Sequence, residues 1–100
     1  MNTKTIVKMQ NLVKMMKSES ANAFRNIMCD ERGFQVVTGG PYGKTIKNAN
    51  YGISKFKDAI VIHDIAHQFD IGGVPHMTTT FYRDKHAVEM FDLLLASLAA

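Results

Sequence analysis

Apolar positions near the start of the chain recur at helical spacing. From residue 5 onward this stripe contains Ile6, Met9, Leu12, Val13 and Met16. After a polar stretch at 18–20 the same period resumes over residues 23–28, and Gly33 ends it. The pattern predicts an N-terminal helix, either continuous or broken into two helices that meet near Ser20.

The period then changes to that of extended structure. Residues 34–38 form a short run rich in β-branched side chains. The run lies between Gly33 and a Gly-Gly-Pro sequence at 39–41, which predicts a strand. Residues 39–57 are rich in glycine, asparagine and lysine, which are poor helix formers in this arrangement. We expect hairpins or an ordered loop there.

Residues 59–71 fit two patterns. As a helix they place Val61, Ile65 and Phe69 on one stripe, and as a strand they place alternate side chains on each face. The turn-forming residues at 72–75 and the β-forming run at 76–83 favour the strand. We therefore predict a 59–71/76–83 hairpin closed by a four-residue turn. Its register sets Ile71 opposite His76 and pairs Asp64 with Arg83 across the strands.

The last segment is a clear amphipathic helix. Asp84 is suited to cap it, and its apolar stripe consists of Ala87, Val88, Phe91, Leu94, Leu95 and Leu98. The whole pattern predicts a single α+β domain over residues 1–100. It has an N-terminal helix, a small antiparallel sheet of three to five strands and a C-terminal helix over 85–98, with the helices on one face of the sheet.

Composition narrows the class of protein. Apolar residues make up 46% and charged residues 21%, which is typical of globular proteins. No apolar run approaches the roughly 20 residues of a membrane span, so we expect no membrane partner. The single cysteine, Cys29, cannot form an intramolecular disulfide, and together with seven methionines it indicates a reducing, cytoplasmic location.

Charge is divided unevenly along the chain. Residues 1–57 carry ten basic against three acidic residues, a net +7, and residues 58–100 carry two against six, a net −4. This division is compatible with an anionic partner for the first half or with head-to-tail self-association. It is equally compatible with lysines that simply keep the surface soluble.

The segment around His63, Asp64 and His67 resembles the H-E-x-x-H zinc helix of neprilysin-type metallopeptidases. The resemblance implies that His63 and His67 bind zinc and that Asp64 stands where the family has its glutamate general base. Two residues four apart are about 6 Å apart on a helix, but about 13 Å apart on a strand. Because we favour the strand, we expect no metal and no other cofactor, and His63 and His67 remain candidates only if 59–71 is helical. On a strand, His67 shares a hairpin face with Thr78 and Thr80.

A second candidate site lies in the glycine-rich segment, where aromatic and basic residues alternate. Aromatic rings can stack on bases while lysines contact phosphates, so this segment is a candidate nucleic-acid-binding surface. The candidate residues are Tyr42, Lys44, Lys47, Tyr51, Lys55 and Lys57, and Phe56 belongs to the same alternating run.

No activated serine or cysteine nucleophile accompanies the histidines, so we expect a protein that is not an enzyme. Five methionines, at 9, 15, 16, 28 and 90, exceed what two helical stripes bury, which favours a homodimer. We expect a small intracellular binding module that regulates or inhibits a protein partner, a class that includes proteins encoded by phages and mobile elements. The alternatives are a nucleic-acid-binding module and a zinc-dependent hydrolase.

Overall fold

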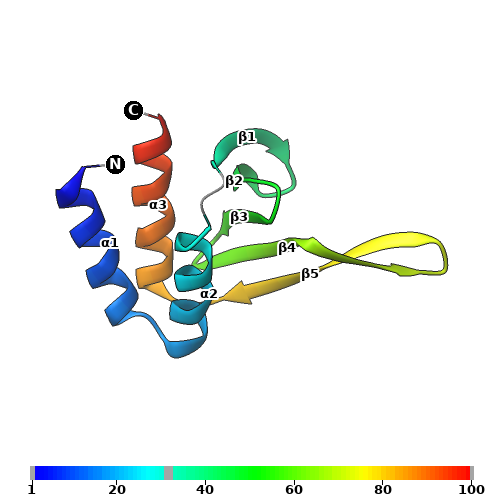
Figure 1. Ribbon diagram of the computed structural model, residues 1–100, viewed down its shortest axis with the longest axis horizontal. Helices are drawn as coiled ribbons and strands as arrows, with labels where there is room; N and C mark the ends of the chain where they lie inside the picture. The colour runs from blue at the N-terminus through cyan, green and yellow to red at the C-terminus, as the bar shows by residue number, and fades with distance from the viewer. Residues whose placement is uncertain (1, 31–32, 100) are drawn as a thin grey trace.

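The computed structural model describes residues 2–30 and 33–99, which form three helices and a five-stranded antiparallel sheet (Figure 1). The helices are α1 (Thr3–Met15), α2 (Ser18–Met28) and α3 (Lys85–Ala99), and the strands are β1 (Gln35–Gly40), β2 (Gly43–Lys47), β3 (Tyr51–Phe56), β4 (Ala59–Ile71) and β5 (Val74–Tyr82). The predicted α+β fold with helices at both ends is confirmed. Within the described part of the chain, no helix combines the length and the apolar character that crossing a membrane requires.

The N-terminal helical segment is broken at Met16 and Lys17, slightly before the predicted position near Ser20. The buried carboxylate of Asp84 holds this break, since its Oδ2 accepts hydrogen bonds from the Lys17 N–H at 2.7 Å and the Ser20 hydroxyl at 2.6 Å. Its Oδ1 accepts from the His86 N–H at 3.0 Å, so Asp84 also caps α3 as the sequence predicts.

The strands follow one another in the order β1-β2-β3-β4-β5, and the helices cover one face of this sheet (Figure 1). The core lies between the two layers. It is formed by Met9, Leu12, Val13, Met16, Ala21, Phe24, Ile27, Ile46, Ile53, Ile60, Ile62, Ala87, Met90 and Phe91. Five methionines were expected to exceed what the helices bury. Three of them, Met9, Met16 and Met90, are core residues, whereas Met15 and Met28 are exposed.

Strand β4 is longer than its neighbour β3. Pairing between them ends at Tyr51 and Asp64, after which β4 and β5 continue alone as a two-stranded hairpin. We call residues 65–77 the arm. The arm projects from one side of the molecule and defines its longest dimension, 47 Å against 28 and 26 Å (Figure 1).

The turn at the end of the arm has two residues, not the four predicted. Gly72 and Gly73 have φ angles of 59° and 82°, and Ile71 pairs with Val74. The predicted pairing of Ile71 with His76 is therefore wrong. Two consecutive positive φ angles define the type I′ turn, which glycine adopts without steric cost and which matches the twist of a hairpin.

A bulge in β4, between Asp64 and Phe69, shifts the register of the hairpin a second time. Asp64 pairs with Thr78 and Phe69 with His76, so four residues of β4 lie opposite Met77 alone. The N–H groups of residues 65 and 66 donate to the Asn50 carbonyl oxygen, at 3.0 and 3.2 Å, instead of to β5. The predicted ion pair of Asp64 with Arg83 is consequently wrong.

Candidate functional site: the arm and the cleft at its base

One face of the arm's end is apolar. Directly paired residues share a face of a hairpin, so Phe69, Ile71, Val74 and His76 lie together. The rings of Phe69 and His76 stack with their centroids 5.9 Å apart. We call these four residues the tip face. Asp70, which pairs with Pro75, lies on the opposite side.

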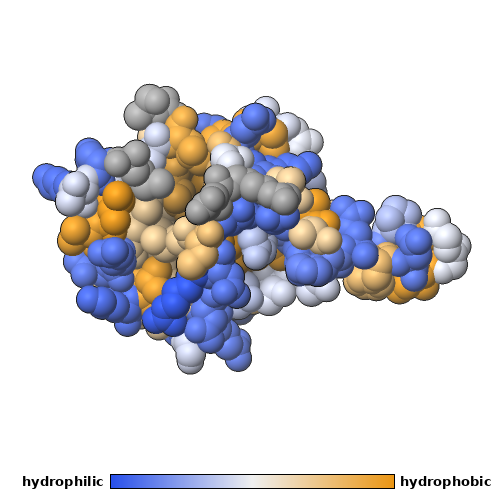
Figure 2. All heavy atoms as spheres, in the orientation of Figure 1, coloured by the Kyte–Doolittle hydropathy of each residue, from blue (hydrophilic) through white to orange (hydrophobic). Residues whose placement is uncertain are grey.

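The tip face is open to solvent. Phe69, Ile71 and Val74 are 48%, 59% and 55% exposed, and hydrophobic atoms are visible at the end of the arm in Figure 2. Burying apolar surface is worth about 25 cal/mol per Å², and an isolated two-stranded hairpin is only marginally stable in water. A protruding cluster of this kind is the type of surface that another molecule covers.

A cleft of about 440 Å³, with both polar and apolar side chains in its walls, lies at the base of the arm, between α2 and the helix side of the sheet. Its hydrogen-bonding side chains come from Glu19, Asn22, Asn26, Tyr51, Asp64, His67, Thr78, Thr80 and Tyr82. His67 Nδ1 lies 3.0 Å from Asp64 Oδ1. His67, Thr78 and Thr80, which were expected to share a hairpin face, therefore line the same cleft.

The cleft and the tip face belong to one surface. Side chains alternate along β5, so Val74 and His76 lie on the same strand face as Thr78 and Thr80. No lysine or arginine lines the cleft among the described residues, and two carboxylates do. A ligand on this surface would meet hydrogen-bonding groups beside α2 and apolar groups at the tip.

The two histidines of the proposed zinc site are separated. Residues 59–71 form a strand, so the condition under which zinc was a candidate is not met. His63 faces away from the helices, with Nδ1 2.8 Å from Thr79 Oγ1, whereas His67 contacts Asp64 in the cleft. Burial lowers the pKa of His63. Nowhere in the described ranges do three potential ligands among His, Cys, Asp and Glu gather around one point.

Part of the nucleic-acid candidate set lies on the sheet face away from the helices. The Tyr42 ring lies 5.4 Å from that of Phe56 and 6.2 Å from that of Phe81, centroid to centroid, and Lys57 Nζ lies 5.4 Å from the Phe56 centroid. We call Tyr42, Phe56 and Phe81 the aromatic cluster. Phe56 and Phe81 are 41% and 50% exposed. Phe81 was not among the predicted residues.

The remaining candidates are dispersed. Tyr51 packs against the core on the helix side, and Lys55 forms a 2.9 Å ion pair with Asp92 of α3. Lys47 is exposed and alternates with the core residue Ile46, which places it on the aromatic side, and Lys44 is exposed at the start of β2. The six predicted residues are thus divided between the two faces of the sheet.

We did not predict the tip face from the sequence, although one signal of it was present. The extended run at 59–71 is about twice as long as the preceding strands, so its end has no neighbour except β5. Comparison with protein-family models, with characterised proteins and with solved structures finds no match to this chain.

Proposed function

We propose that this chain is a protein-binding module that regulates or inhibits its partner by contact rather than by catalysis, and that the arm makes the contact. One observation carries the proposal: three large apolar side chains are exposed together on one side of a projecting hairpin. A few clustered apolar or aromatic anchors that fill a partner's pocket supply most of the energy of many protein interfaces.

The backbone of the arm supports recognition through side chains. Pro75 has no N–H, and in a two-residue hairpin the pair next to the turn-flanking pair directs its N–H groups outward. The outer edge of β5 therefore lacks one donor near its end, which hinders addition of a further strand. We therefore propose insertion of Phe69, Ile71 and Val74 into a groove as the contact.

The cleft gives this interface its polar part. Asn22 and Asn26 offer side-chain amides and Thr78 and Thr80 offer hydroxyls, so polar groups of the partner beside the groove find hydrogen bonds there. We place the interaction in the cytoplasm, because the exposed thiol of Cys29 suits a reducing compartment.

The test is site-specific photo-cross-linking. A photoreactive side chain at position 71 is expected to trap one protein of defined mass, whereas the same group at the exposed Val37 of β1 is not. With that partner purified, Phe69→Ala and Ile71→Ala should each weaken binding about 30-fold or more, as hot-spot truncations do. A partner that binds both variants as tightly as the wild type would contradict the proposal.

The aromatic cluster supports a second candidate function, the binding of single-stranded nucleic acid. Phe56 and Phe81 are exposed next to Lys57 on a sheet face that the helices leave open. Exposed rings beside cations are the arrangement on which bases stack while phosphates are neutralised.

A further inference from the structure

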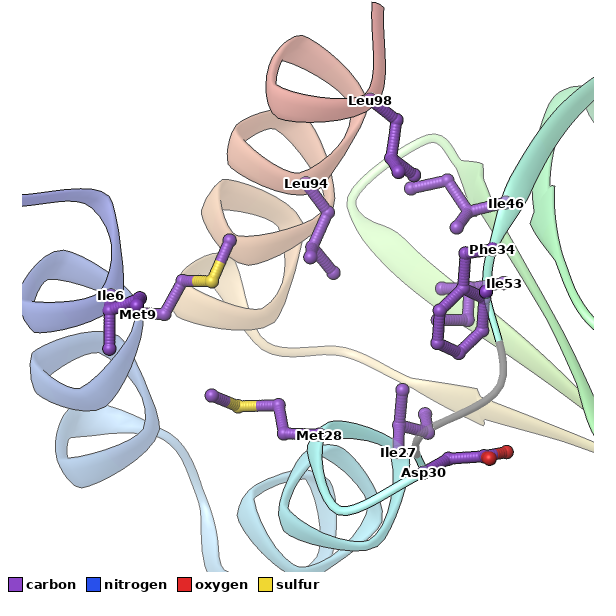
Figure 3. Close-up of a pocket in the computed structure, with 11 residues that line it drawn as sticks. Ile6, Met9, Ile27, Met28, Asp30, Phe34, Ile46, Ile53, Leu94 and Leu98 are labelled. Atoms are coloured by element: carbon purple, nitrogen blue, oxygen red, sulfur yellow. The ribbon is translucent and has the colours of Figure 1, made fainter. Parts of the chain in front are cut away.

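Large exposed apolar side chains gather at a place far from the arm. Ile6 of α1, Met28 of α2 and Leu98 of α3 are 41%, 41% and 37% exposed, and all three line one cavity. The close-up in Figure 3 shows them around the space between the three helices and the sheet.

This cavity is almost entirely apolar. Its volume is about 410 Å³, and its deeper walls are formed by Met9, Ile27, Phe34, Ile46, Ile53 and Leu94. Of the described residues that line it, Asp30 alone carries a polar side chain, and its Oδ2 accepts hydrogen bonds from Asn48 and Asn50. The described residues offer water few hydrogen-bonding partners in this space, which favours an apolar occupant.

We propose that the tip face of one copy occupies this cavity in a second copy, and that a reciprocal exchange of arms makes the chain a homodimer. This inference rests on the proposed function, because it uses the same tip face and names a second copy as the partner. Phe69, Ile71 and Val74 supply the apolar groups that the cavity accepts. A protrusion and a hollow of the same chemistry thus occur on one chain.

Charge supports the same pairing. Residues 58–82, which include the arm, contain three aspartates and no lysine or arginine. Helix α1, which forms one wall of the cavity, carries Lys4, Lys8 and Lys14 and no carboxylate. An arm that enters beside α1 brings Asp70 toward a basic surface, which favours encounter and orientation.

Two arguments favour a reciprocal exchange of arms: it closes the assembly, and it increases the area that the interface buries. A single contact between two different surfaces leaves one of each free and continues into a ring or a filament, whereas a two-fold exchange closes with two copies. Two contacts also bury twice the area of one, toward the roughly 1,200–2,000 Å² in total of a stable interface. The 47 Å length of the molecule lets the arms bridge two bodies that remain apart.

Cys29 provides a direct test, since this exposed thiol follows Met28 at the mouth of the cavity. Wild-type chain is mixed with a Cys29→Ser/Val74→Cys variant and oxidised mildly. The mixed disulfide should form at least about tenfold faster than with the matched control Cys29→Ser/Val37→Cys. Equal rates for the two variants would overturn arm-to-cavity docking.

Sedimentation completes the test. The wild type should sediment at about twice 11.2 kDa, and Ile71→Asp in the arm and Met28→Asp at the cavity mouth should each shift the dimer constant at least about 100-fold toward monomer. Circular dichroism melts check that both variants fold. A wild type that is monomeric at 100-fold dilution and at high concentration, or a dimer that both variants retain, would overturn the proposal. If position 71 still traps a different protein, only the second-copy partner fails, whereas no trapped protein and no dimer would remove the proposed function as well.

Discussion

At the scale of single residues, Asp84 connects three elements that are distant in the sequence. Its carboxylate accepts hydrogen bonds from Lys17 and Ser20 at the α1–α2 junction and from His86 in the first turn of α3. Burial alone would raise the pKa of Asp84, but these hydrogen bonds and one from the Ala87 N–H together hold it below the ordinary value of 3.8. The folded state therefore favours the ionised form.

Replacing Asp84 should make the contribution of this charge visible. Asp84→Ala removes a helix cap and leaves buried donors unpaired, so the free energy of unfolding should fall by about 2–4 kcal/mol. A carboxyl with a lowered folded pKa stabilises the protein above its unfolded pKa and loses that effect as the pH falls through its folded pKa. The stability difference between the wild type and Asp84→Asn should hence be largest above about pH 5 and shrink on acidification.

Urea denaturation between pH 2.5 and 7 measures this difference. The control is Asp58→Asn, at an exposed position between β3 and β4, which should change stability little at any pH. A gap between the wild type and Asp84→Asn that widens on acidification would show that the carboxyl is not held in its ionised form.

At the scale of elements, the turn of the arm determines its register. Gly73 has a φ of 82° with no neighbouring atom within 4 Å, so Gly73→Ala is opposed by backbone strain alone, about 1–2 kcal/mol. Asparagine tolerates positive φ, and Asn-Gly is a preferred type I′ sequence, so Gly72→Asn should leave the arm intact. Gly40→Ala, at a glycine with an open environment and no positive φ, is the control.

Amide hydrogen exchange reads this effect locally. Exchange at Ile71 and Val74 should accelerate in Gly73→Ala and remain at the wild-type rate in Gly72→Asn and Gly40→Ala, because the arm opens without unfolding the core. Equal acceleration in Gly72→Asn would contradict a type I′ turn.

The same element shows how far the sequence could predict the fold. The helices follow from apolar spacing, and the β4–β5 hairpin follows from its β-branched runs, since both patterns are local. The register was predicted wrongly for two reasons. The Gly72-Gly73 sequence closes a two-residue turn in place of the predicted four-residue turn, which is a local feature. The bulge depends on the Asn50 carbonyl, about fifteen residues away in the chain, which accepts from Ile65 and Ala66. The projection of the arm was not predicted either. The arm projects because β3 stops pairing with β4 at Tyr51, and the extent of this pairing cannot be read from the sequence of β4 alone.

The candidate sites were predictable only in part. Alternation along a strand places neighbouring side chains on opposite faces, so a list of nearby lysines and tyrosines does not define one surface. Tyr51 shares its face with the core residue Ile53 and is drawn into the core, whereas Tyr42 reaches Phe56 and Phe81 from a turn. Tyr42 and Phe81 are far apart in the sequence, so a local pattern does not predict their contact.

Because the candidate residues lie on opposite faces of the sheet, nucleic-acid binding can be tested with matched variants on each face. If single strands bind the aromatic cluster, Phe81→Ala or Tyr42→Ala should cost about 1–3 kcal/mol through lost stacking. Lys47→Gln and Lys57→Gln should each flatten the salt dependence of binding by about 0.7. Tyr51→Phe and Lys55→Gln, on the other face of the sheet, are the controls.

Fluorescence anisotropy with a labelled single strand at several salt concentrations supplies both quantities. Losses that are as large for Lys55→Gln as for Lys57→Gln would show that the lysines act only through net charge. Absence of binding at low salt would remove this candidate function.

At the scale of the whole molecule, the chain consists of a body that holds the core and an arm that contributes nothing to it. The core cluster includes Ile62 before the arm and resumes at Ala87, with no core residue between them. Substitutions on the exposed surface of the arm should therefore leave the packing of the body unchanged. Stability should depend on the body and binding on the arm.

Excision of the arm tests this separation. Replacing residues 67–77 with Gly-Gly keeps the N–H groups of Ile65 and Ala66, which donate to Asn50, and closes a short loop between the paired residues Asp64 and Thr78. Because no core contact is removed, calorimetry should show one cooperative transition within a few degrees of that of the monomeric Ile71→Asp variant. The excised protein should no longer bind the purified partner and should no longer dimerise, and it should keep any binding at the aromatic cluster. Loss of cooperative melting would instead assign the arm a structural role, since a binding element outside the core can be removed without unfolding the body.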